Sequence, residues 1–439
     1  MAPKGGKKKK GSGGNTLKPL RLEMLNGTSD EESMNDNMSV ISNISDSTVL
    51  DDGGGNFGCE VGEDGVALED GFEDKMSQAL DGLSQKSVQG RINCLEALNT
   101  ALSRRFVPDF VIDRRVTVSD AIERSLKKGR GDEQTCAAQL ATSVAVQLGS
   151  GDLTDSLCEE LNPLLAFIMN DTSVSCKTRA KCSWALAVLS FIGDTEDLCD
   201  TMRGLARLFS GSYRKGDDTL PGVSVELGAL HAAALSSWTL LCTLTGGQKS
   251  QDMPSILQLS DLLDSPHLDI RMAAGEAIAL LLEQQRGGSA DYDEDEEEEM
   301  NSLVEKLRAL ATDSHKYRAK KDRKTQRSSF RDILRYVESG ESPNIQIRFG
   351  QESLQVDSWV RKKQYDAFCT VLGSGVNLHL SENDLVRDVL QLGARISPLN
   401  IASLKQSKQE RHLMNAASFK ARCLSRAKNR DKRSALLST

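Results

Sequence analysis

The chain has 439 residues and a formal net charge of −8; 38% of its residues are hydrophobic and only 4% are aromatic. This composition supplies the Leu, Ala, Ile and Val of a helical core and excludes an aromatic-rich β-sandwich. Only nine prolines interrupt the chain, which leaves room for long helices. We therefore expect an all-α protein.

Residues 1–74 are predicted to form a disordered tail that is basic at first and then acidic. After the cluster from Lys7 to Lys10, residues 28–74 hold fourteen acids and neither Lys nor Arg. A segment with so few bulky apolar side chains cannot bury enough surface to fold. A second acidic tract, residues 291–299, holds eight acids. Without these two tracts the net charge becomes positive, so the body of the protein is basic.

An internal repeat begins near residue 75, where the apolar residues take up a helical period. The stretch from Arg91 to Leu98 matches residues 179–186 at its first, fourth, seventh and eighth positions, and residues 271–278 keep the same frame of arginine, two small residues and one aliphatic. Weaker copies start at 133 and 228, so successive copies lie 42, 46, 49 and 43 residues apart. This is the period of armadillo and HEAT units, which contain two or three helices each. We predict an armadillo/HEAT-like helical solenoid over residues 75–313, in which the small residues let helices approach and the aliphatic one fills the core.

The rest of the chain is predicted to form a mostly helical C-terminal domain over residues 314–404 and a basic helix or tail over residues 405–439. Ile345 to Phe349 alternate like a short β-strand between Pro343 and Gly350. The other elements expected here are an acidic loop at 291–299 and helices at about 300–313, 315–337, 359–372 (ending at the Gly373-Ser374-Gly375 turn) and 382–392.

The sequence offers no catalytic or metal centre. Its five histidines are far apart, no phosphate-loop or nucleophile-elbow spacing occurs, and His231 is expected to be a packed core residue. The alternating aspartates of residues 291–295 resemble the start of a calcium loop, but Glu296 and Ser302 stand where that loop needs Gly and Glu. Ten scattered cysteines without a C-x-x-C pair indicate a reduced intracellular compartment. We expect no enzyme activity, cofactor, metal or small-molecule substrate, and no membrane partner, because nothing reaches the roughly 18 apolar residues of a span.

Two basic segments give the strongest functional signal. Residues 315–335 carry nine Lys or Arg and residues 405–433 carry ten, each against two acids. Positive charges packed this densely repel one another unless a polyanion neutralises them. If the polyanion binds through its phosphates, the binding weakens as the salt concentration rises. Arg327, Arg331 and Arg335 recur at every fourth position and form one stripe on a helix. The residues expected to contact RNA in the first segment are Lys316, Arg318, Lys320, Lys321, Arg323, Lys324, Arg327 and Arg331.

Other interpretations of these segments stay open. Tyr317 and Phe330 could stack on exposed bases, whereas Phe330 could equally anchor the helix in the core. Residues 320–324 and 430–433 would also serve as nuclear-localisation patches. The basic residues could also form solvated helix faces without a partner.

Long strings of this sequence carry a family resemblance. The most distinctive are DRRVTVSDAIERSLKKG at residues 113–129 and LRALATDSHKYRAK at residues 307–320. Further matching stretches are residues 271–281, 326–331, 357–359, 371–375, 416–422 and 430–433. Over about residues 75–435 the chain resembles the interferon-related developmental regulator family.

The resemblance implies an armadillo-like N-terminal region, a family-specific C-terminal domain and no enzymatic activity. It also implies binding to idle ribosomes near the tRNA sites, with a C-terminal helix that occupies the mRNA path and represses translation. That helix corresponds to residues 407–433. Cys423 and Leu424 stand where the family is expected to have Thr and Lys, so one cation is missing. The residues carried over as phosphate contacts are Lys420, Arg422, Arg426, Lys428, Arg430, Lys432 and Arg433.

A second function associated with the family is nuclear co-regulation of transcription during differentiation. In that case the repeat groove would hold protein partners, such as transcriptional regulators or chromatin-modifying complexes, and the basic runs would act as import signals. The two basic segments indicate an anionic partner without separating the two functions, and the family resemblance favours the ribosome and its RNA. We expect the protein in the cytoplasm and in the nucleus.

Overall fold

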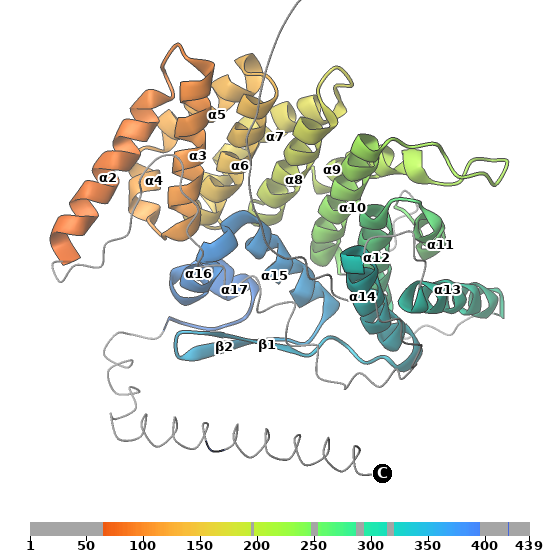
Figure 1. Cartoon of the computed structure of the whole chain (residues 1–439). Coiled ribbons are helices and arrows are strands. Elements are labelled where there is room, and N and C mark those ends of the chain that lie inside the picture. The colour runs from red at the N-terminus through yellow and green to blue at the C-terminus, as the bar shows by residue number, and fades with distance from the viewer. Residues whose placement is uncertain are drawn as a thin grey trace, which may run out of the picture. The chain divides into compact units, whose positions relative to one another are not determined.

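The computed structural model describes residues 65–194, 197–246, 253–286, 294–313 and 320–395, together with Lys420. Six long helices in it pack side by side in chain order, each against the next, and we call them the core row (Figure 1). They are α3 (Val88–Arg104), α6 (Asp132–Leu148), α8 (Cys176–Ile192), α10 (Val225–Thr245), α12 (Leu268–Arg286) and α14 (Lys320–Ser339).

Each helix of the core row packs against one or two flanking helices that precede it in the chain. Short 3-10 turns at Ser210–Ser212 (η2) and Leu262–Asp264 (η3) extend two of these flanking helices. The unit of two or three helices is therefore repeated through the described residues, which confirms the predicted armadillo-like, all-α fold. The flanking helices are α2 (Gly65–Gly82), α4 (Pro108–Asp113), α5 (Arg115–Lys128), α7 (Asp152–Asn170), α9 (Leu198–Phe209), α11 (Ile256–Asp261) and α13 (Glu294–Thr312).

The sequence repeat coincides with the core row, because its five copies start within the first turn of α3, α6, α8, α10 and α12. The aliphatic side chain at the eighth position is buried in every copy, as predicted. At the first position, the Arg91 guanidinium donates to both carboxylate oxygens of Glu133, the first residue of the next copy, at 2.6 and 2.9 Å. The buried eighth-position residues are Leu98, Leu140, Leu186, Leu235 and Ile278.

A sixth copy, which the sequence comparison missed, lies in α14 and starts at Gln326. Phe330 and Ile333 of this copy are fully buried against α12. Gly275 makes this close approach possible: a Cβ atom there would lie 2.8 Å from Cε1 of Phe330 and 2.9 Å from Cδ1 of Ile333. The basic helix is therefore part of the repeat stack.

Residues 340–395, which we call the covering segment, return along the core row. They form the antiparallel hairpin of β1 (Ile345–Phe349) and β2 (Glu352–Val356), in which Ile345 pairs with Val356 and Phe349 with Glu352. The predicted strand is thus confirmed, and its partner strand is an addition to the prediction. Three helices and a 3-10 turn follow: α15 (Trp359–Leu372), η4 (Gly373–Gly375), α16 (Val376–Glu382) and α17 (Asp384–Val389).

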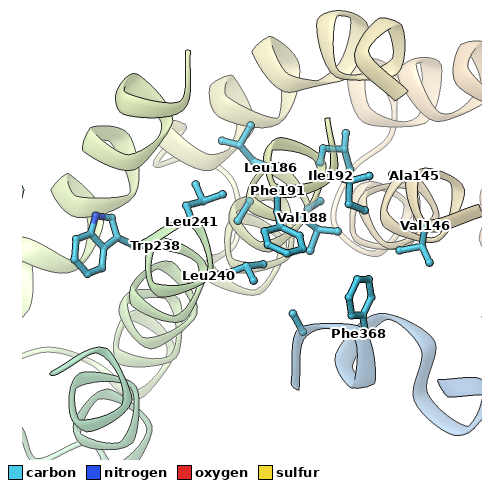
Figure 2. Packing of buried hydrophobic residues seen from close by; sticks show 14 of the residues in the cluster. Ala145, Val146, Leu186, Val188, Phe191, Ile192, Trp238, Leu240, Leu241 and Phe368 are labelled. Carbon is cyan, nitrogen blue, oxygen red and sulfur yellow. The ribbon is translucent and has the colours of Figure 1, made fainter. Parts of the chain in front are cut away.

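The covering segment shares the hydrophobic core of the repeats. Helix α15 contacts α3, α6, α10 and α12, and α16 contacts α3. In Figure 2 the ring of Phe368, on α15, points toward Val146 and Phe191 on the core row. The rings of Phe368 and Phe191 meet edge to face, with centroids 6.4 Å apart. The apolar side chains of the covering segment are therefore buried by helices that lie far away in the sequence.

A carboxylate from the core row caps the covering segment. Glu283 of α12 accepts hydrogen bonds from the backbone N–H groups of Trp359 and Val360, each at 2.9 Å. These are free donors of the first turn of α15, and negative charge is favourable at that end of a helix. The side chain of Ser358 accepts from a third N–H, that of Arg361, at 3.0 Å.

We expect Glu283→Ala to lower the free energy of unfolding by about 2 kcal/mol, because two half-buried N–H groups lose their acceptor. Hydrogen exchange should accelerate first in α15. The control is Glu160→Ala on the exposed side of α7, which should change the free energy by less than about 0.5 kcal/mol. Equal effects of the two substitutions would contradict the capping role.

Three segments have secondary structure that differs from the prediction. Helix α2 starts at Gly65, inside the predicted tail, because Phe72, Met76 and Leu80 form an apolar face that packs against α3. Helix α13 includes most of the predicted acidic loop, since Glu favours helices and acids are stabilised near their N-termini. The helix predicted at 382–392 is the shorter α17, which starts where the Asn383 side chain accepts from the N–H of Val386, and the preceding α16 was not predicted.

Helix α10 is long and apolar enough to cross a membrane by length and composition alone, which the sequence analysis had not recognised. In the structure, 67% of its most apolar window is buried. Its neighbours are α8, α9, α12 and α15. The apolar side chains of α10 are therefore explained by its buried place in the middle of the core row.

Candidate nucleic-acid interface

The candidate interface is the exposed side of α14. One side of this helix is buried through Gln326, Phe330, Ile333 and Val337, whose spacing places them on a single helix face. The burial of Phe330 decides between its two interpretations: it anchors the helix and is not available to stack on bases. The tertiary fold therefore leaves the opposite side of α14 to charged residues.

That opposite side carries a row of cations. Arg327 is half-buried and the other members are exposed. From the first to the last of them the helix rises about 16 Å. We call this set the basic stripe: Lys320, Lys321, Lys324, Arg327 and Arg331.

Most cations of the basic stripe lack acidic partners. Within the described ranges, Lys320, Lys321, Arg327 and Arg331 form no ion pair. By contrast, Arg335 at the end of the helix lies 3.8 Å from carboxylate oxygens of both Asp332 and Glu341. A polyanion would therefore meet four cations that have no ion-pair partner among the described residues.

Only part of the predicted RNA-contacting set can be placed. The structure brings Lys320, Lys321, Arg323, Lys324, Arg327 and Arg331 together on α14 and shows Lys420 exposed in a helical conformation. Tyr317 and the remaining predicted contacts lie outside the described residues. Those contacts are Lys316, Arg318, Arg422, Arg426, Lys428, Arg430, Lys432 and Arg433.

Gln326 holds the basic stripe in position, a role that the sequence analysis missed. Its side-chain oxygen accepts from Nη2 and Nε of Arg271 at 2.7 and 3.2 Å. Its side-chain nitrogen donates to the Leu310 carbonyl at 3.3 Å and to Asp313 at 3.1 Å. One buried amide thus joins α12, α13 and α14. The sequence signal that could have revealed this role is the polar residue at the first position of the sixth repeat copy.

A cluster of charges lies between α12 and α15 and is neutralised within the chain. Nζ of Lys363 lies 2.7 Å from Oγ of Ser236 and 3.7 Å from Glu276, and Nζ of Lys362 lies 2.7 Å from Asp366. Burial lowers the pKa of Lys363. Although desolvation opposes it, the two ammonium groups hold the pKa of Glu276 below its usual value. These lysines fasten the covering segment to the core row.

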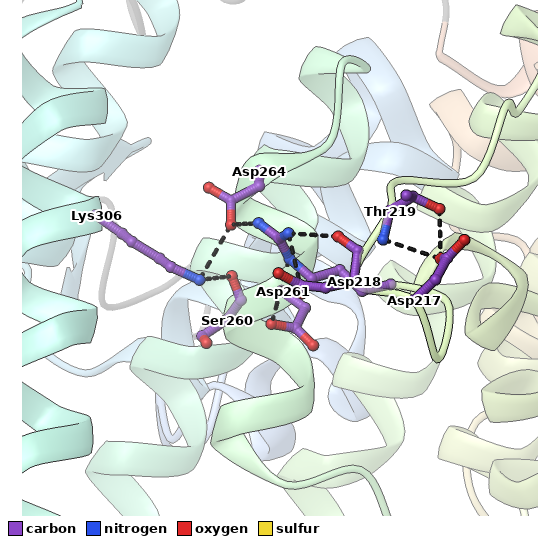
Figure 3. Close-up of polar contacts among 8 residues, drawn as sticks. Asp217, Asp218, Thr219, Ser260, Asp261, Asp264 and Lys306 are labelled. Atoms are coloured by element: carbon purple, nitrogen blue, oxygen red, sulfur yellow. Dashed lines mark hydrogen bonds and ion pairs between the residues drawn. The ribbon is translucent and has the colours of Figure 1, made fainter.

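A second acidic cluster is also matched by cations of the chain (Figure 3). Nη2 of Arg214 lies 2.8 Å from Asp264 and Nη1 lies 3.2 Å from Asp218. Nζ of Lys306 lies 3.1 Å from the same Asp264 oxygen. The cluster ties the loop before α10 to η3 and α13, so its role is structural.

The groups that could support catalysis are buried or dispersed. His231 is buried, with Nδ1 2.7 Å from Oγ of Ser212, in agreement with the predicted core position. Burial raises the pKa of the Cys136 thiol to about 11 and that of Cys182 to about 12, which disfavours thiolates. In the part of the chain that the structure describes, no three His, Cys, Asp or Glu side chains gather as metal ligands would.

The stability of the protein should depend on pH through two buried histidines. Burial lowers the pKa of both His231 and His379 from 6.5 to about 4. Between these values the unfolded chain binds protons that the native state excludes, so stability is full above pH 6.5 and falls toward pH 4. We expect a loss of about 1 kcal/mol per pH unit for each histidine. In urea denaturation at pH 7 and pH 5, His379→Gln should show a smaller difference than the original chain; an equal difference would contradict this origin.

Comparisons with known proteins give the family. The family model described as "Interferon-related developmental regulator (IFRD)" matches residues 37–338, and "Interferon-related protein conserved region" matches residues 383–434. Interferon-related developmental regulator 1 of Homo sapiens is 40% identical over 413 residues, which cover 92% of this chain and 89% of that protein. Interferon-related developmental regulator 2 of Mus musculus is 41% identical over 388 residues, covering 86% and 87%. A designed armadillo repeat protein in complex with the peptide (KR)4 matches 59% of this chain and 99% of that chain, with 13% identity and a TM-score of 0.36.

Proposed function

The chain belongs to the interferon-related developmental regulator family, and from this premise we propose that it is a non-enzymatic, RNA-binding regulator of translation. In this proposal the basic stripe contacts ribosomal RNA. The basic helix near the C-terminus, residues 407–433, enters the mRNA path of idle ribosomes and represses translation. The protein would act in the cytoplasm and also be present in the nucleus.

The observation that carries the proposal is the basic stripe. Four of its five cations are exposed and Arg327 is half-buried, along about 16 Å of one helix side. RNA phosphates attract such a row without regard to sequence and release counterions when bound. The contribution of residues 407–433 rests on the family resemblance, since of the predicted contacts there only Lys420 is described.

Sucrose-gradient sedimentation with ribosomes at two salt concentrations tests the proposal. We expect the full chain to co-sediment at low salt and to dissociate steeply as salt rises. The triple charge reversal Lys320→Glu, Arg327→Glu and Arg331→Glu should reduce the slope of log affinity against log salt by about three, because each lost phosphate contact removes roughly one unit. Deleting residues 405–439 should abolish translational repression.

The matched control is Arg124→Glu, Lys128→Glu and Arg130→Glu, which makes the same change in net charge at exposed sites on and just after α5. This variant should sediment like the original chain. Association that is insensitive to salt, or equal loss in both triple variants, would refute binding through the basic stripe.

Nuclear co-regulation remains the second proposal, because Lys320, Lys321 and Lys324 form an exposed cluster that suits an import signal. Helix α15 already lies against α3, α6, α10 and α12 of the core row, so a protein partner would need another surface. Reversing the charges at these lysines should exclude the protein from nuclei. If nuclear entry is unchanged, this role of the cluster is refuted.

A further inference from the structure

A threonine hydroxyl lies among the cations of α14. Thr325 directly follows Lys324, is exposed, and makes no hydrogen bond to any residue of the described chain through its side chain. Some other helical threonines bond to the backbone of their own helix: Thr239 donates to the carbonyl of Leu235 at 2.8 Å and Thr142 to that of Gln139 at 2.7 Å. The hydroxyl of Thr325 is therefore exposed to solvent.

The residues around Thr325 are basic on both sides. Arg323 and Lys324 precede it, and Arg327 follows two positions later. An enzyme with an acidic substrate groove would select this pattern by charge complementarity. The neighbouring hydroxyls, Ser328 and Ser329, are half-buried and less accessible.

We propose that Thr325 is a phosphorylation site for a protein kinase that prefers basic flanks, and that its phosphorylation switches off the basic stripe. In the reaction Oγ1 of Thr325 attacks the terminal phosphorus of a nucleoside triphosphate. The bond from that phosphorus to the bridging oxygen breaks, the nucleoside diphosphate leaves, and the hydroxyl proton passes to the base of the kinase. The regulatory half of this inference rests on the proposed function; the modification site itself does not.

The effect follows from the chemistry of the added group. Phosphothreonine brings about −1.5 to −2 charges and three strong acceptor oxygens. Lys321 lies four residues before Thr325 on the same helix, so it can pair with the new phosphate. The phosphate is the same group that RNA presents to the basic stripe, and it competes from within the chain at a high effective concentration.

Access to Thr325 requires the first turns of α14 to open, because a kinase binds its substrate as an extended chain. Local opening at a helix end costs less than global unfolding. The next residue, Gln326, opposes this opening through its bonds to Arg271. Phosphorylation of the folded protein should therefore be slow relative to that of an unfolded chain.

The test uses the full chain, a kinase catalytic domain that prefers basic flanks, and ATP. Mass spectrometry of the intact protein and of its fragments should find one phosphate, at Thr325. Phosphorylation should weaken binding to a fluorescent RNA duplex about tenfold near physiological salt, because the phosphate occupies Lys321 and adds nearly two negative charges beside the basic stripe. Thr325→Val should bind RNA normally and lose nothing when treated with kinase.

Charge at this position is tested independently by Thr325→Glu, with Thr117→Glu at an exposed site on α5 as the matched control. The first should weaken RNA binding and the second should not. Phosphate found only at other residues overturns the proposed site, and phosphate at Thr325 without loss of RNA affinity overturns the switch. If Thr325 is phosphorylated but the unmodified protein binds neither the duplex nor ribosomes, the site stands and the proposed function fails.

Discussion

We expect Gln326→Leu to lower the free energy of unfolding by about 3 kcal/mol and to weaken RNA binding together with it. Arg271 is only 2% exposed, and two of its N–H groups donate to the Gln326 oxygen. Leu has nearly the volume of Gln, so the loss comes from the guanidinium and not from a cavity. The bond from Nη1 of Arg271 to the Ser265 carbonyl, 2.6 Å long, remains and limits the loss.

Urea denaturation and RNA titration measure the two effects. The control is Gln89→Leu on the exposed side of α3, which should change stability by less than about 0.5 kcal/mol. The double variant Arg271→Met with Gln326→Leu should be more stable than the sum of the single changes predicts, because no buried charge is then left without its acceptor. Strict additivity would show that the two side chains do not act as a pair.

Gly375→Ala is expected to lower the free energy of unfolding by about 3 kcal/mol, at the upper end of what overpacking costs. A Cβ atom at this position would lie 1.9 Å from the carbonyl oxygen of Ser103 and 2.8 Å from Cα of Arg104. Both neighbours are backbone atoms of α3 and cannot rotate away. The φ and ψ angles of Gly375, −85° and −5°, suit alanine, so the whole effect arises from the close approach of η4 to α3.

Hydrogen exchange identifies where Gly375→Ala acts. Exchange should accelerate in α16 and α17, since η4 must move away from α3. Gly373→Ala is the informative control: its φ of +51° strains an alanine, but a Cβ there meets no atom within 4 Å. It should cost about 2 kcal/mol, because φ of +51° with ψ of −123° is strained for alanine. A larger loss for Gly373→Ala than for Gly375→Ala would contradict the packing argument.

Features that depend on short spacings could be predicted from the sequence. The buried aliphatic residues from Leu98 to Ile278 follow from the repeat, and β1 follows from the alternation at Ile345–Phe349. The sixth copy was hidden because neither Gln326 nor Asp332 fits the frame at its first and seventh positions, and because 55 residues separate Gln326 from Arg271. What the first positions share here is a hydrogen bond between neighbouring copies, as in Arg91 with Glu133 and Arg271 with Gln326. A search for identical residues does not detect that property.

Contacts between distant parts of the chain could not be predicted. Nδ2 of Asn383 donates to the carbonyl of Val146, 237 positions earlier, at 2.9 Å. Periodicity shows that a helix has an apolar side, but it does not identify the surface that this side meets. Charge density in the sequence was enough to locate the basic helix. It could not show that Phe330 lies in the core and Arg327 beside the exposed lysines, because tertiary packing decides this.

The contacts of α15 with α3, α6, α10 and α12 have a consequence for unfolding. In a repeat protein each unit touches only its neighbours, so the ends can fray while the middle stays folded. Here one helix connects units near both ends of the row. Loosening any of them exposes apolar surface on α15 and weakens its hold on the others. The array should therefore melt in a single cooperative transition, whose midpoint falls when either the first or the fifth unit is damaged.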